Sequence, residues 1–154
     1  MHFLEDLPVG YSSEIGRWQL TTEEVVTFAK AWDPQPFHID EAAATESVFG
    51  GLVASSLHIF AICTRLFFDH EDRIQTMAML GKDKIRLSQP ARATDLLIYH
   101  TECISNKASE SKTDRGIIVL ADTVMREDGE TVMTQQVTLM VSTGSLTDSG
   151  ADSA

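Results

Sequence analysis

The feature that most constrains the fold is an apolar stretch from residue 55 to residue 68, SSLHIFAICTRLFF. Apolar side chains occupy nearly every face of a helical wheel drawn through it, so the helix that it predicts has to be enclosed by the rest of the chain. At 1.5 Å per residue this helix would be about 21 Å long, enough to run through a small sheet. It is shorter than the roughly 20 apolar residues of a membrane-spanning helix, so we expect it to form the centre of a globular core.

The second half of the chain has the pattern of β-strands. Four segments there alternate polar and apolar residues or are dense in Val, Ile, Leu and Thr, at residues 84–87, 96–104, 116–126 and 131–141. The Asp128-Gly129 pair between the last two is typical of a hairpin turn. A further entry strand is expected at residues 15–20. An enclosed helix followed by antiparallel strands predicts an α+β fold whose sheet wraps around a long central helix.

The length of 154 residues predicts a single domain. We expect it to span residues 1–142 and to be followed by a disordered tail, because residues 143–154 are small and polar. A sheet curled around one helix leaves an exposed edge, which a second subunit commonly covers. We therefore expect a homodimer or a higher even oligomer.

Two helices are predicted before the apolar stretch. Thr21 followed by Glu24 fits a capping box at the start of a helix over residues 22–32, where apolar residues fall at helical spacing. That helix is expected to end at Asp33, since the residue before a proline disfavours the α conformation. Asp40 is placed as the cap of a second, short helix.

The composition excludes several classes of function. The net charge of −11 argues against a nucleic-acid partner and against docking on anionic lipid, both of which require a basic face. The N-terminus has neither a basic region nor a long apolar core, so no signal peptide is expected. Cys63 and Cys103 lack the spacing of a zinc site and are expected in the core of a cytoplasmic protein, with no metal bound.

An acid and a histidine precede the apolar stretch. Asp33 and His38 are separated by a proline-stiffened segment and could hold one water molecule between them, one removing a proton and the other delivering one. Ser55 and Ser56 lie where the enclosed helix should begin, and a helix N-terminus presents unpaired N–H groups that suit a developing negative charge. Each of these residues also has a purely structural interpretation, as a cap or a backbone-bonded loop residue.

The segment DPQPFHID followed by FGGLVASS resembles the MaoC-like dehydratases, the (R)-specific enoyl-CoA hydratases of the hot-dog fold. The resemblance covers roughly residues 15–142. It implies reversible addition of water to a trans-2-enoyl thioester of CoA or an acyl carrier protein, without any further cofactor. It implies a catalytic role for Asp33 and His38, and substrate-binding positions at Phe37, Gly51, Ser55, Ser56 and Thr64.

The chain departs from the family pattern at three positions. Gln35 stands where asparagine is usual, and Thr94 replaces the glycine of the usual Gly-Asp turn. Ser56 stands where the family has a glycine whose backbone N–H binds the thioester carbonyl, which is the best support for a function without catalysis. The alternatives are a hot-dog acyl-CoA thioesterase and a non-catalytic subunit that binds acyl thioesters. His58 and Arg65, the polar exceptions in the enclosed helix, are expected at its open edge or at a dimer seam.

Overall fold

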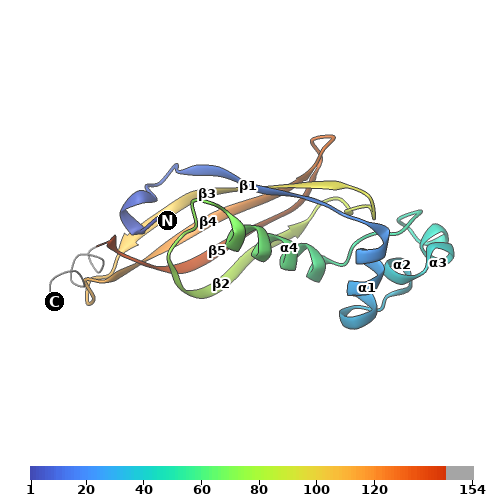
Figure 1. The fold of residues 1–154 in the computed structure, drawn as a ribbon, viewed down its shortest axis with the longest axis horizontal. Coiled ribbons are helices and arrows are strands. Elements are labelled where there is room, and N and C mark those ends of the chain that lie inside the picture. The colour runs from blue at the N-terminus through green and yellow to red at the C-terminus, as the bar shows by residue number, and fades with distance from the viewer. Residues whose placement is uncertain (145–154) are drawn as a thin grey trace, which may run out of the picture.

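The computed structural model describes residues 1–144 and shows one antiparallel sheet with a helix lying along it (Figure 1). The five strands are arranged in the order β1-β3-β4-β5-β2. The helices α1 to α3 gather at one end of the sheet, and the N-terminus lies at the other. The elements are η1 (Leu4–Asp6), β1 (Ser12–Gln19), α1 (Thr22–Trp32), α2 (Pro36–Ile39), α3 (Glu41–Glu46), α4 (Ser56–Asp69), β2 (Thr76–Leu87), β3 (Leu96–Ala108), β4 (Arg115–Arg126) and β5 (Thr131–Ser142).

The sheet confirms the strands expected in the second half of the chain. Strands β3, β4 and β5 are antiparallel neighbours, and burial alternates along each of them as expected for a sheet with one covered face. The β4–β5 hairpin turns at Gly129, whose φ of +87° is readily adopted only by glycine. The hairpin turn therefore lies at the Asp128-Gly129 pair, as predicted. This antiparallel sheet packed on a helix is the hot-dog fold.

The enclosure of α4 is only partly as predicted. Its buried side chains are His58, Ile59, Ile62 and Cys63, which face the sheet and α1. On the opposite face, apolar side chains are left exposed in the single chain, among them Leu57 at 47% and Phe68 at 54%. The sheet therefore covers one side of the helix and leaves the other open. The prediction of an antiparallel sheet wrapped around a helix is confirmed, and the central position of that helix is confirmed in part.

The caps of the first helices follow the sequence closely. The Thr21 hydroxyl accepts a hydrogen bond from the Glu24 N–H at 3.2 Å, and Asp40 caps α3 by accepting from the Ala43 N–H at 2.9 Å. The reciprocal half of the predicted capping box is missing, because the Glu24 carboxylate accepts from the Trp18 indole at 2.6 Å instead. Helix α1 ends at Trp32, as the proline after Asp33 requires.

Thr143 and Gly144, the first two residues of the predicted tail, are held by the rest of the chain. Thr143 is 8% exposed and donates to the Thr113 carbonyl, so it belongs to the folded part of the chain. The Gly144 N–H donates to the Glu5 carboxylate. The rest of the predicted tail, residues 145–154, lies outside the described residues.

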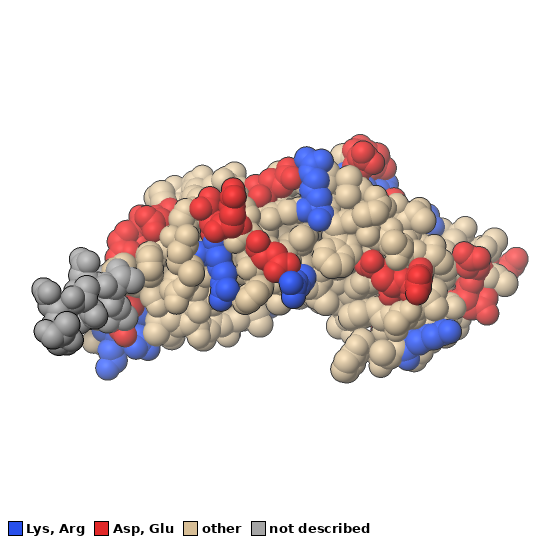
Figure 2. All heavy atoms as spheres, viewed as in Figure 1, with Lys and Arg blue, Asp and Glu red and all other residues tan. Residues whose placement is uncertain are grey.

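Acidic side chains are spread over the face of the molecule seen in Figure 2, in keeping with the net charge of −11. Within residues 1–144 there is no helix both long and apolar enough to span a membrane. Cys63 and Cys103 are free and buried, which confirms their expected place in the core.

Candidate active site

Asp33 stands at the C-terminal end of α1, where the chain leaves the helix. Its side chain is 27% exposed. The Ser55 hydroxyl donates a hydrogen bond to Asp33 Oδ2 at 2.7 Å. No other hydrogen bond to this carboxylate is found within the described part of the chain, so Asp33 keeps most of its lone pairs for water or a ligand.

His38 lies on α2, a short helix where the sequence predicted a loop. Pro36 occupies the first turn of this helix, where the missing N–H costs nothing. His38 Nδ1 lies 2.6 Å from the Val53 carbonyl oxygen, which can only accept, so Nδ1 carries the hydrogen. In the neutral ring Nε2 then holds a lone pair. Nε2 lies 3.4 Å from Asp33 Oδ2, so the two atoms can share one proton, and a water molecule beside them can contact both.

The Val53 carbonyl is fixed by the backbone around it. Val53 pairs with Arg92 in an isolated antiparallel bridge, and the Ala54 N–H donates to the Ala91 carbonyl at 2.8 Å. The Val53 N–H donates to the Phe37 carbonyl. The segment before α4 is therefore held both to the α2 helix and to the chain ahead of β3, and it orients the His38 ring.

The helix α4 begins beside this pair. Ser55 is its N-cap, with no exposed surface, and its Oγ accepts from the Leu57 N–H at 3.2 Å while donating to Asp33. The Ser55 side chain thus contacts the acid and does not reach the adjoining cavity. The Ser56 N–H has no acceptor among residues 1–144 and lies at the positive end of a 14-residue helix.

A cavity of about 340 Å³ opens next to His38 and Ser56. Phe37 also lines it and meets the His38 ring edge-on at a centroid distance of 4.6 Å. Gly51 does not line it. The lining residues are Phe37, His38, Phe49, Val53, Ala54, Ser56, Ile59, Leu87, Ser88, Gln89, Pro90 and Ala91.

Comparisons with known proteins identify the family of the chain. The sequence model described as the MaoC like domain matches residues 11–124. The chain belongs to the MaoC-like domain family.

Solved structures share the whole fold with this MaoC-like domain. The MaoC-like dehydratase from Rhodospirillum rubrum is 33% identical, with a TM-score of 0.87 over 93% of this chain and 98% of that one. The R-hydratase PhaJ1 from Pseudomonas aeruginosa is 20% identical, with a TM-score of 0.75 over 92% of this chain and 86% of that one. The uncharacterized protein YdeM of Bacillus subtilis is 27% identical over 66 residues, which are 43% of this chain and 47% of that protein, so the match spans about half of it. The family and the Rhodospirillum rubrum structure together indicate a hydratase or dehydratase, and PhaJ1 shares the fold.

The remaining predicted site residue lies elsewhere in the MaoC-like domain. Thr64 is two turns along α4 and lines a separate cavity beneath β2. Its hydroxyl donates to the Phe60 carbonyl at 3.0 Å, within the helix. The structure therefore brings together Asp33, His38, Phe37, Ser55 and Ser56, and leaves Gly51 and Thr64 outside that group.

Sequence reasoning missed a buried polar contact behind the acid–histidine pair. His58 is 6% exposed and stacks on Phe28, so the prediction of an open edge was wrong for this residue. Its Nε2 lies 3.3 Å from Glu24 Oε1, the same atom that accepts from the Trp18 indole. Burial lowers the pKa of His58, although the Glu24 charge opposes that shift. This cluster ties α1 to α4 just behind the elements that carry Asp33 and Ser55.

Proposed function

We propose that the protein is an acyl-thioester hydratase/dehydratase that adds water reversibly to a trans-2-enoyl thioester. The observation that carries the proposal is the facing pair formed by His38 Nε2 and Asp33 Oδ2, 3.4 Å apart, in which His38 lines a cavity. With Nδ1 committed to the Val53 carbonyl, Nε2 is free to take or give a proton in the direction of Asp33. The family membership supports the same reaction class.

Hydration needs a hydroxyl at the β-carbon and a proton at the α-carbon, both from one water molecule. A water held between Asp33 and His38 can lose its proton to one of these groups while its oxygen attacks the β-carbon. The pair then delivers a proton to the α-carbon, so that atoms and charge balance over the cycle. Dehydration follows the same steps in reverse.

The carbonyl oxygen of the thioester gains negative charge during this addition. The unpaired Ser56 N–H at the start of α4, together with the helix dipole, is placed to stabilise that charge. The contact is made by the backbone, so the serine at this position keeps the donor that the family glycine supplies. In this proposal Ser55 holds Asp33 in place, and Phe37 contacts the acyl group near the reacting carbons.

The substrate is proposed to be a thioester of CoA or of an acyl carrier protein, with no additional cofactor. Thr64 is proposed to lie along the path of the acyl chain, and Gly51 to leave room for the backbone near the thioester. A Cβ at Gly51 would lie 3.7 Å from the Arg92 guanidinium, whose Nη1 donates to the Phe49 carbonyl and fixes this turn.

A homodimer is proposed on the exposed edge of the sheet. Within residues 1–144, strand β2 pairs with β5 alone, and apolar side chains are exposed along it beside charged ones. An open edge of this kind is normally covered in a native protein. The exposed apolar side chains of β2 are Met77, Met79, Leu80, Ile85 and Leu87. We expect Leu80→Lys to convert a dimer to a monomer in light scattering after size-exclusion chromatography, whereas an unchanged mass would place the interface elsewhere.

The reaction is tested by following two signals on crotonyl-CoA. Loss of the enoyl absorbance without release of free CoA is expected for the wild type. His38→Gln is expected to lower the rate by about 10²- to 10⁴-fold while keeping the fold, because it removes a group that transfers protons. Release of CoA would identify a thioesterase, and binding without turnover would identify a non-catalytic acyl-thioester-binding subunit.

A further inference from the structure

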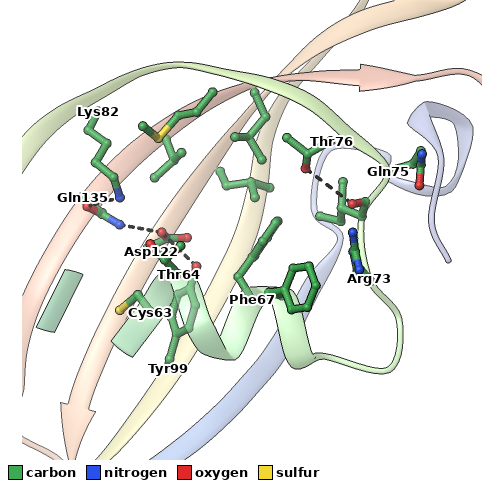
Figure 3. Close-up of a pocket in the computed structure, with 16 residues that line it drawn as sticks. Cys63, Thr64, Phe67, Arg73, Gln75, Thr76, Lys82, Tyr99, Asp122 and Gln135 are labelled. Atoms are coloured by element: carbon green, nitrogen blue, oxygen red, sulfur yellow. Dashed lines mark hydrogen bonds between the residues drawn. The ribbon is translucent and has the colours of Figure 1, made fainter. Parts of the chain in front are cut away.

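A second cavity of about 280 Å³ lies beneath the C-terminal half of α4, between that helix and the sheet (Figure 3). One side is apolar, formed by residues such as Phe67, Val137 and Leu139. The other side is polar, with Asp122, Gln135 and Lys82 gathered on neighbouring strands. Polar side chains at the centre of a hydrophobic core need a specific explanation.

The polar side of the cavity is an ordered cluster. Asp122 is 2% exposed and accepts hydrogen bonds from the Tyr99 hydroxyl at 3.1 Å, Thr101 Oγ1 at 2.7 Å and Gln135 Nε2 at 2.8 Å. Gln135 Oε1 accepts in turn from Lys82 Nζ at 3.3 Å. The amide thus bridges a carboxylate and an ammonium, so their charges are neutralised within the cluster.

Lys82 is the member of this cluster that has N–H donors without an acceptor among the described residues. An ammonium has three N–H donors, and within residues 1–144 only the one to Gln135 has an acceptor. The ammonium lies over the Phe60 ring, 5.6 Å from its centroid, in a position that lines the cavity. A hydrocarbon chain that filled the cavity would displace the water around these donors without replacing its hydrogen bonds, which lowers affinity.

At the Lys82 side of the cavity, the charge of the cluster favours a neutral oxygen over a second carboxylate. Asp122 already supplies the counter-charge of Lys82, and Arg73 lies at the other end of the cavity, so an anionic group beside Lys82 would leave one negative charge uncompensated in a place of low dielectric constant. A ketone or hydroxyl oxygen accepts from Lys82 without adding charge. The matching ligand therefore has an apolar chain for the Phe67 side and one neutral oxygen for the Lys82 side.

The two cavities lie along the same helix. Ser56 and Ile59 line the catalytic cavity, and Cys63 and Thr64 line the second one. Seven residues of helix separate Ser56 from Cys63, a distance of about 10 Å. Strand β2 bounds both cavities, through Leu87 in one and Lys82 in the other. An extended acyl chain of about eight carbons covers this distance.

We propose that the second cavity selects acyl chains that carry a neutral oxygen, a ketone or hydroxyl, near the end remote from the thioester, with Lys82 as the donor to that oxygen. The proposal rests on the proposed function, since it takes the thioester to be bound at the N-terminus of α4. In this proposal Lys82 is a specificity-determining residue, and the buried Asp122 cluster holds the Lys82 ammonium in position through Gln135.

The test is a binding measurement that does not depend on turnover. Isothermal titration of the wild type is carried out with octanoyl-CoA, 7-oxooctanoyl-CoA and octanedioyl-CoA, which are saturated and cannot be hydrated. Free CoA is followed in the same samples. The same titrations are made on Lys82→Met, which keeps the length of the side chain without its donors, and on Lys107→Met, the same change at an exposed position on β3.

We expect the wild type and Lys107→Met to bind 7-oxooctanoyl-CoA about tenfold more tightly than octanoyl-CoA, as for one hydrogen bond to a charged group. Lys82→Met should bind the two ligands equally. The comparison of two ligands within one protein is insensitive to a general loss of stability in the variant.

Equal binding of octanoyl-CoA and 7-oxooctanoyl-CoA by the wild type overturns the proposal, and so does a preference that survives in Lys82→Met. Tightest binding of octanedioyl-CoA also overturns it, because the cavity would then be an anion site, with Arg73 at its other end as the candidate cation. Hydration of crotonyl-CoA by the wild type, whose short chain stops before the second cavity, decides the proposed function separately. If crotonyl-CoA is hydrated, any of these results counts against the second cavity alone.

Discussion

Asp33 contacts His38, which lines the first cavity, and Asp122 lines the second; the surroundings of the two acids differ sharply. Asp33 receives one hydrogen bond, from Ser55, and its side chain is 27% exposed beside the His38 ring. Asp122 receives three hydrogen bonds and is 2% exposed. Burial raises the pKa of Asp122, while the hydrogen bonds from Thr101, Gln135 and Tyr99 oppose that shift.

The difference in exposure and in hydrogen bonds suits Asp33 to proton transfer and Asp122 to a structural role. A carboxylate that exchanges protons with water needs free lone pairs and access to solvent, which Asp33 retains. A carboxylate whose oxygens are saturated by fixed donors stabilises the positions of those donors, which is the arrangement at Asp122. In the proposed function, the same residue type therefore takes part in catalysis at one end of α4, and at the other end it orders side chains of the core.

The largest expected effect is on activity at Asp33. Asp33→Asn keeps the shape of the side chain but removes its charge and its ability to take a proton. We expect hydration of crotonyl-CoA to fall by about 10²- to 10⁴-fold. The free energy of unfolding, measured by urea denaturation, should change by less than about 1 kcal/mol, because the side chain is partly exposed and has a single donor.

The matched control is Asp40→Asn, on the cap of α3. Asparagine caps a helix as well as aspartate does, so both activity and stability should be retained. Asp33→Asn with more than a tenth of the wild-type rate would remove Asp33 from the catalytic pair.

At Asp122 we expect substitution to lower the stability of the fold. Asp122→Asn places an amide N–H₂ where a carboxylate oxygen now accepts from buried donors, so at least one donor loses its acceptor. We expect the free energy of unfolding to fall by about 2 kcal/mol, within the range for a buried unsatisfied group. Urea denaturation at neutral pH measures it. A variant as stable as the wild type would mean that the Asp122 cluster does not support the core.

Features of the fold that depend on neighbouring residues could be predicted from the sequence. Thr21 and Asp40 were assigned as caps because capping depends on the next few residues, and helix α1 ends before Pro34 for an equally local reason. The strands followed from side-chain alternation. The acid–histidine pair was recognised because both residues lie within six positions of each other, joined by a stiff segment.

The contacts that define the two sites could not be predicted in the same way. The His38 tautomer depends on the Val53 carbonyl, whose position depends on pairing between residues 52–54 and 91–93. The Asp122 cluster joins side chains from different strands, brought together only by the register of the sheet. Glu24 was predicted to bond to its own helix terminus and instead contacts Trp18 and His58, because tertiary partners displaced the local one.

The smallest expected effect concerns the pH dependence of stability at His58. Burial lowers the pKa of His58 in the folded protein, so the unfolded chain binds its proton more readily than the folded one. Stability therefore has its full His58 contribution above the ordinary pKa of 6.5 and loses it as the pH falls below that value. The loss is limited, since the Glu24 carboxylate partly stabilises the charged ring.

This contribution is isolated by comparing the wild type with His58→Gln, in which an amide can still donate to Glu24 but does not titrate. We expect the melting temperature of the wild type to fall more than that of His58→Gln between pH 7.5 and pH 5.5, with all other acids and histidines common to both. An equal decrease in the melting temperatures of the two proteins would mean that burial does not keep the His58 ring neutral. A larger fall in the variant would mean that the charged ring is favoured in the folded state, through its ion pair with Glu24, and that the contact behind the catalytic pair is a salt bridge.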